Sequence, residues 1–222
     1  MATNNVSSFL QVIGQGVKPN MFNVDIQFPT GFNDATINDL AGGELASEGA
    51  GGNAGKELTS ILCKSAALPG SNLGVIEVPF RGRTVKIAGD RTFDTWSATF
   101  FNDKNMEIRG LFEEWANLLN THEGNTAPRF LPNGGDTGYM ASLFVTQLEK
   151  DDKEGGSAIR TYELHHCFPT NISQIDLAYD SNDQIEEFTV EWQYSYFTAS
   201  KTNSGTAASE HVKGTASART VV

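Results

Sequence analysis

Two aspartates and one arginine lie within five positions of each other, in the run Ala88–Trp96, which reads AGDRTFDTW. Asp90 and Asp94 could act as the acid and base of a carbohydrate-active enzyme if a turn placed both carboxylates across a cleft. Arg91 lies between them, however, and a nearby guanidinium lowers the pKa of a carboxyl group, whereas a general acid needs a raised pKa. The residues therefore favour a structural role over a catalytic one.

The structural interpretation of this run is a charged corner between two strands. Gly89 permits turn conformations that other residues avoid, and Asp90 can accept hydrogen bonds from backbone amides there. Arg91 then has Asp94 within reach for a bidentate ion pair. The residues that we expect to form the corner are Gly89, Asp90, Arg91, Asp94 and Trp96.

A second cluster, His165-His166-Cys167, offers three types of metal ligand in a row. Neighbours on a strand point to opposite faces, so His165 and Cys167 would share one face and His166 the other. A tetrahedral site needs further ligands on one face, and the sequence has no CxxC or HxxxH pair to supply them. We therefore predict half-buried strand histidines and no metal site.

Other catalytic and cofactor motifs are missing from the sequence. It contains neither a GxSxG elbow for a serine nucleophile nor a GxxxxGK[ST] loop for a nucleotide phosphate. Cys63 follows two apolar residues in an expected core strand, which does not suit a reactive thiol. We predict no catalytic residues and no cofactor.

Charge and composition exclude further classes of protein. The chain has 222 residues, with 16 Lys and Arg against 27 Asp and Glu, and a formal net charge of −11. Such a surface repels nucleic acid and anionic membrane. The chain has no secretory signal in Met1–Gln11 and no apolar stretch long enough for a membrane anchor. Two cysteines, Cys63 and Cys167, do not make a disulfide framework and suit a reducing compartment.

Alternation of apolar and polar residues dominates the chain and predicts a mainly β protein. The predicted strands are Phe22–Phe28, Leu58–Ala66, Gly74–Phe80, Thr84–Ala88, Thr95–Phe101, Ser142–Lys150, Ala158–Phe168, Ile172–Tyr179 and Ile185–Phe197.

One segment, Met106–Asn120, has helical spacing instead and follows the cap candidates Asp103 and Asn105. Its apolar face comprises Ile108, Leu111, Phe112, Trp115, Leu118 and Leu119. The fold class that follows is two packed antiparallel sheets, a sandwich or barrel, with one amphipathic helix covering an open side.

Two segments are too poor in apolar residues to pack. A glycine-rich loop insertion at about 30–57 contains Ala41–Gly55, which reads AGGELASEGAGGNAG. The segment 199–222 is rich in Ser, Thr, Ala and Gly and is predicted to be a flexible extension. We therefore expect one domain over residues 1–198.

Several runs together resemble the tail tube protein of contractile-tailed bacteriophages. The matching runs, in family order, are Lys18–Val24 (KPNMFNV), Lys64–Gly70 (KSAALPG), Val85–Trp96 (VKIAGDRTFDTW), Asn102-Asp103 with the helix that follows, Phe168–Ile172 (FPTNI) and Asp180–Ile185 (DSNDQI). The resemblance covers roughly residues 9–28 and 58–198. The segment 30–57 is longer than the first hairpin usual in the family, and the chain after Phe197 is an extension.

The resemblance implies a structural subunit of hexameric rings that stack into a hollow tube. One sheet from each of six subunits would join into a continuous β-barrel around the channel. A contractile sheath would surround the tube, with baseplate and tail terminator proteins as further partners, and genomic DNA would pass through without specific binding. The protein would be assembled in the host cytoplasm and reside in the virion. Inner tubes of type VI secretion systems and contractile bacteriocins belong to the same superfamily and are the alternative.

The last predicted strand shows how a channel wall could be built. Its aromatic face would pack on the core, and its acidic face, with Glu187 and Glu191, would point to water. Together with Asp176 from the preceding predicted strand, these residues are candidates to line the lumen, where like charge keeps DNA from sticking. An ordinary solvated outer face is the alternative for the same residues.

Overall fold

The computed structural model describes residues 6–14, 16–29, 54–126, 138–149 and 157–201, which form nine strands and three helices. The strands are β1 (Phe22–Ile26), β2 (Cys63–Ala66), β3 (Asn72–Phe80), β4 (Arg83–Thr92), β5 (Trp96–Phe101), β6 (Ala141–Glu149), β7 (Ser157–Ile172), β8 (Glu187–Gln193) and β9 (Tyr196–Lys201). The helices are α1 (Val6–Ile13), α3 (Ala54–Leu62) and α4 (Glu107–Leu119). The protein is mainly β, as predicted.

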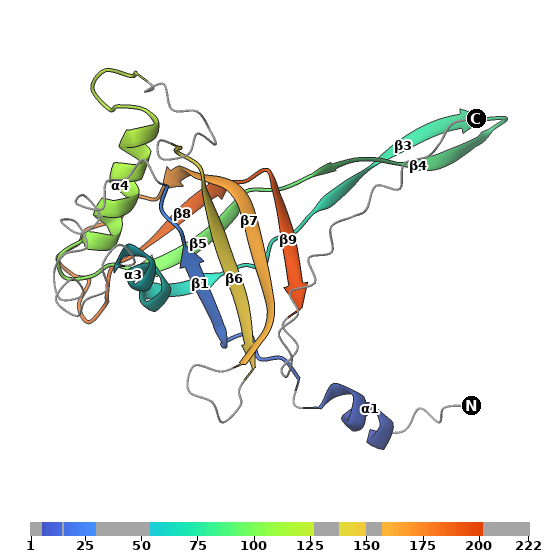
Figure 1. Cartoon of the computed structure of the whole chain (residues 1–222), viewed down its shortest axis with the longest axis horizontal. Helices are drawn as coiled ribbons and strands as arrows, with labels where there is room; N and C mark the ends of the chain where they lie inside the picture. The colour runs from blue at the N-terminus through green and yellow to red at the C-terminus, as the bar shows by residue number, and fades with distance from the viewer. Residues whose placement is uncertain (1–5, 15, 30–53, 127–137, 150–156, 202–222) are drawn as a thin grey trace.

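Strand β7 belongs to two antiparallel sheets (Figure 1). Its first part pairs with β6 on one side and β9 on the other, and its last residues, from Phe168, pair with β8. Between the two parts, His166 has a φ of 58°, a left-handed conformation that non-glycine residues adopt rarely. The first sheet therefore has the order β1-β6-β7-β9 and the second the order β2-β5-β8-β7.

The core is formed by the inner sides of both sheets together with helix α4. Alternate residues of β5 and β8 are buried, as the period of a strand requires, and the exposed face of the sheet carries the residues between them. From α4, the ring of Phe112 lies 5.3 Å from that of Phe100 and 5.6 Å from that of Trp192. Each fully buried ring of this kind stabilises the fold by about 1.5–3 kcal/mol, because its apolar surface is removed from water.

Helix α4 confirms the helix predicted at Met106–Asn120. Ile108, Leu111, Phe112 and Trp115 are fully buried, and Leu118 is half-buried against the same cluster. The helix starts after Met106, which is left-handed and gives no side-chain cap. Asp103 takes that role from further back, because its carboxylate accepts hydrogen bonds from the backbone amides of Asn105 and Ile108 at 3.0 and 3.2 Å.

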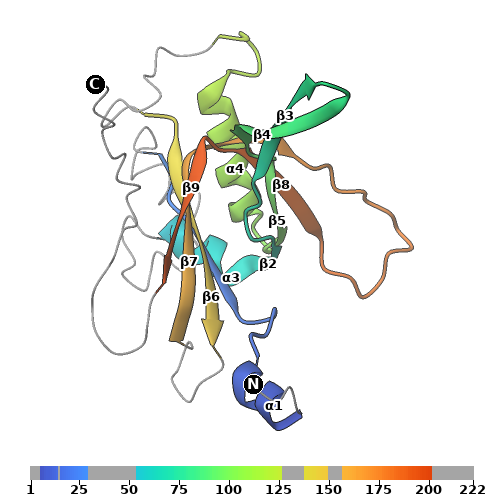
Figure 2. The same cartoon turned by 90° about the vertical axis from the view of Figure 1, so that its right-hand side faces the viewer.

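Strands β3 and β4 form a separate two-stranded sheet that projects from the rest of the protein; we call this hairpin, Asn72–Thr92, the arm (Figures 1 and 2). Its turn is Arg81-Gly82, with φ values of 47° and 81°. Positive φ at both central residues matches the right-handed twist of the flanking strands, so a two-residue turn closes the hairpin.

Three predicted elements are corrected by the structure. The predicted strand Leu58–Ala66 is helical through Leu62 and becomes strand β2 only at Cys63. The predicted strand Ile172–Tyr179 is not formed: β7 ends at Ile172, and residues 173–179 belong to the connection that follows. The predicted long strand Ile185–Phe197 is two strands in different sheets, β8 and β9.

The expected single helix is accompanied by α1 and α3 among the described residues. Helix α3 takes up 54–57, the end of the predicted glycine-rich insertion, and β9 takes up 199–201, the start of the predicted extension. The remainder of both segments, 30–53 and 202–222, lies outside the described residues.

Candidate assembly surfaces

The outer side of the second sheet is mostly polar, and we call it the polar face; the half-buried ring of Phe101 also lies on it, 5.6 Å from the Lys64 ammonium. It comprises Lys64, Ser97, Thr99, Glu187, Thr189, Glu191 and Gln193. Strand register places these side chains opposite one another, with Ser97 beside Glu191 and Thr99 beside Thr189, whose hydroxyls lie 3.1 Å apart. A sheet that is apolar on one side and polar on the other can hold a core while its second side borders water.

The two acids predicted for a channel wall, Glu187 and Glu191, both lie on the polar face. Glu187 is bound by Lys64 of β2, whose ammonium donates hydrogen bonds to both carboxylate oxygens at 2.5 and 2.6 Å. Across the sheet, Glu191 lies opposite the hydroxyl-bearing Ser97. Glu191 therefore gives this face its uncompensated negative charge, while the charge of Glu187 is partly neutralised.

Asp176, the third predicted wall residue, is not on a strand. It lies in the connection between β7 and β8, residues 173–186, which we call the β7–β8 loop. Its carboxylate accepts a 3.4 Å hydrogen bond from the Gln174 amide in the same loop. The structure thus separates Asp176 from Glu187 and Glu191, which share the polar face.

The run AGDRTFDTW forms the last part of the second strand of the arm and its attachment to β5. Trp96 opens β5 and is buried, and its indole Nε1 donates a hydrogen bond to the carbonyl of Ala67 at 2.6 Å. Phe93 packs its ring 5.6 Å from that of Tyr194. Asp94 accepts a 2.7 Å hydrogen bond from the Asn72 amide, at the first residue of β3. These contacts fix the base of the arm to the body.

The predicted details of the corner are corrected. Gly89 does not form a turn, because β4 continues through it to Thr92, and the change of direction comes at 93–95. Arg91 does not pair with Asp94, which is bound by Asn72 instead. Asp90 lies on the exposed strand β4, whereas Asp94 lies in the connection to β5.

The reason for a glycine at position 89 is close approach between strands. A Cβ on Gly89 would lie 3.2 Å from the backbone carbon and oxygen of Gly74 and 3.2 Å from Cγ1 of Ile76. The register of the arm shifts at this point, between Leu73 and Val75. The two glycines therefore let the two strands of the arm come together at a bulge.

One side of the arm is apolar and is covered by no other described part of the chain. Register pairs Ile76 with Ile87 and Val78 with Val85, and Phe80 continues the same side toward the turn. These five side chains are 42–62% exposed. An isolated two-stranded hairpin is marginally stable in water, so an apolar ribbon of this length needs a partner.

The sequence alone did not assign a functional role to this apolar side. Both strands were predicted, but their alternation is equally typical of strands inside a sandwich. One pattern in the sequence does indicate the hairpin: Arg81-Gly82 lies between two predicted strands of similar length, which is typical of two strands that pair with each other.

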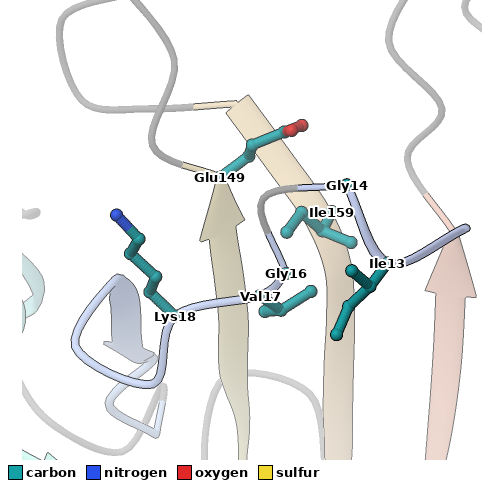
Figure 3. Close-up of a pocket in the computed structure, with 7 residues that line it drawn as sticks. All are labelled: Ile13, Gly14, Gly16, Val17, Lys18, Glu149 and Ile159. Atoms are coloured by element: carbon teal, nitrogen blue, oxygen red, sulfur yellow. The ribbon is translucent and has the colours of Figure 1, made fainter. Parts of the chain in front are cut away.

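A hollow of about 290 Å³ lies where the chain leaves α1 (Figure 3). It is lined by Ile13, Gly14, Gly16, Val17, Lys18, Glu149 and Ile159. Its polar groups are one ammonium and one carboxylate, and the catalytic candidates Asp90 and Asp94 are not among its lining residues. Among the described residues, no group of three or more His, Cys, Asp and Glu is placed to hold a metal ion.

The two cysteines are free thiols, and Cys167 is buried. Burial raises the pKa of each thiol to about 12, because the charged thiolate is poorly solvated there. Nucleophilic attack requires the thiolate, so neither cysteine is poised for catalysis near neutral pH. No helix among the described residues is both long and apolar enough to cross a membrane.

Comparison with known proteins identifies the family. The family model described as phage tail tube protein matches residues 17–200. The chain belongs to the phage tail tube protein family. Tail tube protein gp19 of Enterobacteria phage T4 is 33% identical over 138 residues, which are 62% of this chain and 80% of gp19. The tail tube protein of Serratia phage KSP90 is 27% identical over 134 residues, which are 60% of this chain and 71% of that protein.

The fold agrees with this membership. A chain of an extracellular contractile injection system, in its sheath–tube complex, superposes with a TM-score of 0.52 at 11% identity, covering 90% of this chain and all of that one. A chain of the anti-feeding prophage baseplate gives a TM-score of 0.51 at 13% identity, covering 81% of this chain and 92% of that one. The chain is thus a structural tail tube subunit, similar in sequence to tail tube proteins of phages.

Proposed function

We propose that this tail tube protein forms hexameric rings that stack into a hollow tube, with the polar face lining the channel. The observation that carries the proposal is the construction of the second sheet. It is buried on one side, in part by α4, and is polar on the other; among the described residues, its two edges, β2 and the last part of β7, are open. Pairing β2 of one copy with β7 of the next removes both edges and closes a barrel.

The charge of the polar face suits a conduit for DNA. Phosphate groups bind to basic surfaces and release counterions, whereas an acidic wall gives them no site to adhere to. Glu191 and, in part, Glu187 supply this negative charge, and we place Asp176 at the end of the wall, in the first part of the β7–β8 loop, just after β7. Genomic DNA would pass the wall without specific binding.

The first sheet and α4 would then face outward, toward a contractile sheath. Baseplate and tail terminator proteins are the expected partners at the two ends of the tube, and assembly is expected in the host cytoplasm before the tube becomes part of the virion. The role is architectural, without catalysis, and Asp90 and Asp94 serve the base of the arm.

Negative-stain electron microscopy of the purified protein tests the proposal of rings and tubes. Six-fold rings or stacked tubes with a stain-filled channel are expected. Discrete monomers at concentrations of about 10–100 μM, well above those at which specific interfaces associate, would contradict the proposal.

The lining of the channel is tested by reversing its charge. In phage carrying Glu191→Lys, or Glu187→Lys together with Glu191→Lys, we expect slower genome ejection, because ammonium groups bind passing phosphates. Glu123→Lys with Glu149→Lys is the matched control, since these exposed residues lie outside the polar face. Ejection kinetics equal to wild type in the Glu191 variant would exclude the polar face as the channel wall.

A further inference from the structure

The two edges of the second sheet that are open among the described residues, β2 and the last part of β7, carry the same irregularity. In β2, the register with β5 shifts between Cys63 and Ser65, so Lys64 is an extra residue in that strand. In β7, the register with β8 shifts in the same way, and Thr170 is the extra residue. Each open edge thus contains a β-bulge, which redirects the side chains around it.

The bulge in β2 changes the order in which its side chains face the core. Cys63 and Ala66 pair with buried residues of β5 and pack against the core. Between them, Lys64 and Ser65 are both exposed, and Ser65 pairs with Thr99 of the polar face. The order along β2 is therefore inward, outward, outward, inward, whereas a regular strand alternates strictly.

The last part of β7 has the same order of faces. Pro169 and Ile172 pair with buried residues of β8. Between them, Thr170 and Asn171 are exposed, and Asn171 pairs with Glu191 of the polar face. The edges of the first sheet are different, because β1 and β9 pair with their neighbours without a register shift and alternate regularly.

A ring brings β2 and β7 together in antiparallel orientation. Within the second sheet, each strand runs antiparallel to the next along the order β2-β5-β8-β7, so β2 and β7 have opposite directions. Rotation about a ring axis preserves that relation between one subunit and the next. Full overlap of the two four-residue segments then places inward residues opposite inward ones and outward opposite outward. A slip of one residue opposes inward to outward side chains at most of the remaining positions.

We propose that the two bulges lie side by side in the closed ring and fix the register between neighbouring subunits. The pairs, each between one subunit and the next, are Cys63 with Ile172, Lys64 with Asn171, Ser65 with Thr170, and Ala66 with Pro169. This inference rests on the proposed ring assembly and specifies which residues meet where two subunits join. The regular edges β1 and β9 do not match the bulged order, so the same device directs β2 to β7 rather than to the first sheet.

Disulfide cross-linking of rings tests the register. Ser65 and Thr170 are exposed and lie opposite each other in the proposed pairing, so a chain with Ser65→Cys and Thr170→Cys should be joined to both neighbours. Oxidation with copper phenanthroline is expected to give a ladder up to the hexamer on a non-reducing gel, which collapses to monomer on reduction. Each single variant controls for the native thiols, Cys63 and Cys167, and should give no ladder.

Ala67→Cys with Thr170→Cys is the matched control for a shifted register. Ala67 is exposed, like Ser65, and lies two residues further along the chain. In the proposed register its Cα lies roughly 8 Å from that of Thr170, because the strands are about 5 Å apart and two residues span about 6.7 Å. A disulfide requires a Cα separation below about 7 Å, so we expect no ladder from this pair.

A charge exchange tests the same pairing without new thiols. Lys64→Glu places an acid beside Glu187 and should raise the protein concentration needed for rings at least about tenfold, equivalent to about 1.4 kcal/mol. Asn171→Lys in the same chain should restore rings, because the new ammonium lies opposite the new carboxylate of the next subunit. Positions 64 and 171 of one subunit lie on opposite edges of the sheet, so the recovery arises between copies. Lys64→Glu with Gln193→Lys, which adds the same charges to the polar face, should not recover.

Two outcomes would overturn the register. A ladder from the Ala67 pair in place of the Ser65 pair would show a shifted pairing. Rings that give no ladder from either pair, and no recovery by Asn171→Lys, would show that β2 and β7 do not meet as proposed. Circular dichroism verifies that each variant is folded before assembly is scored. Failure of the wild-type protein to form rings would instead contradict the proposed function, so the two failures are distinguishable.

Discussion

At the scale of single residues, the base of the arm depends on small groups in close contact. Asp94 holds Asn72 at one strand, Tyr194 donates a hydrogen bond to the carbonyl of Gly70 at 3.2 Å, and Gly89 lies against Gly74. Burial, followed by the charge of Asp94, raises the pKa of Tyr194, so its hydroxyl stays protonated and keeps donating at physiological pH. The direction in which the arm leaves the body follows from these few contacts.

Replacing Gly89 with valine tests the close approach. Valine ordinarily favours a strand, but here its Cβ would meet the backbone of Gly74 at 3.2 Å, so we expect the arm to separate at its base. Tube formation should fall sharply while the melting temperature of the body changes by only a few degrees, in line with a change of about 1 kcal/mol or less. Sedimentation and a thermal melt measure the two effects.

Gly70→Val is the matched control for this prediction. A Cβ at position 70 meets nothing within 4 Å, although the residue lies in the same region at the base of the arm. Normal tubes from Gly89→Val would show that the two strands can move apart there at no cost to assembly.

At the scale of elements, helix α4 is the support of the second sheet. Its Trp115 is fully buried, donates a 3.0 Å hydrogen bond from Nε1 to the carbonyl of Tyr139, and lies 5.7 Å from the ring of Phe28. Packing on the inner side of this sheet determines the curvature and position of the polar face on its other side. Loosening α4 should therefore also disturb the polar face, on the opposite side of the sheet.

Substituting Trp115 with alanine should cost about 3–5 kcal/mol of unfolding free energy, since the change removes a buried ring and leaves a cavity. Leu118→Ala, at a half-buried position of the same helix, should cost clearly less. Urea unfolding of the two variants compares them. Equal losses would mean that the helix is held by its general apolar surface and not by the aromatic cluster.

The elements that could be predicted from sequence are those whose pattern is local. Strand β5 and helix α4 each show one uninterrupted period, and both were placed within a residue or two. The run Glu186–Tyr196 also alternates without error, yet the chain leaves the second sheet after Gln193 and pairs again with β7 from Tyr196. Alternation of apolar and polar residues does not indicate which sheet a strand joins. The division of this run into β8 and β9 follows only from their pairing with distant segments.

Helix α3 was missed for a different physical reason. The run Leu58–Leu62 is short, and although its three apolar residues have helical spacing, a single turn does not distinguish a helix from a strand. Packing decides between them: Leu58 and Thr59 are buried, and the hydroxyl of Ser60 bonds the Asn23 amide oxygen of β1. The candidate site could be predicted only in part. Glu187 and Glu191 follow strand alternation, which is local, whereas the loop position of Asp176 and the projection of the arm depend on tertiary structure.

At the scale of the whole molecule, the arm is separable from the body. Strands β3 and β4 pair only with each other, and the seven other strands are hydrogen-bonded without them. The same separation holds for charge, since the arm is basic and the chain as a whole is acidic. We therefore expect the body to fold independently of the arm.

Replacing Leu73–Arg91 with a two-residue Asn-Gly turn tests this separation. The shortened protein should fold cooperatively, with a melting temperature within a few degrees of the full-length subunit, and should form no tubes. Circular dichroism and sedimentation velocity measure both properties. An unfolded or molten product would show that the arm contributes to the core, contrary to the pairing of the sheets.

The order of the strands also has a consequence in time. Strand β1 pairs with β6, more than a hundred residues later, so at a synthesis rate of about 5–20 residues per second β1 waits on the order of ten seconds for its partner. The arm, in contrast, closes on itself within about 1–10 μs of leaving the ribosome. It is then complete but uncovered, and its waiting time depends on the concentration of other finished chains. In the proposed assembly, each new arm would therefore stay uncovered for longer as the concentration of finished subunits falls.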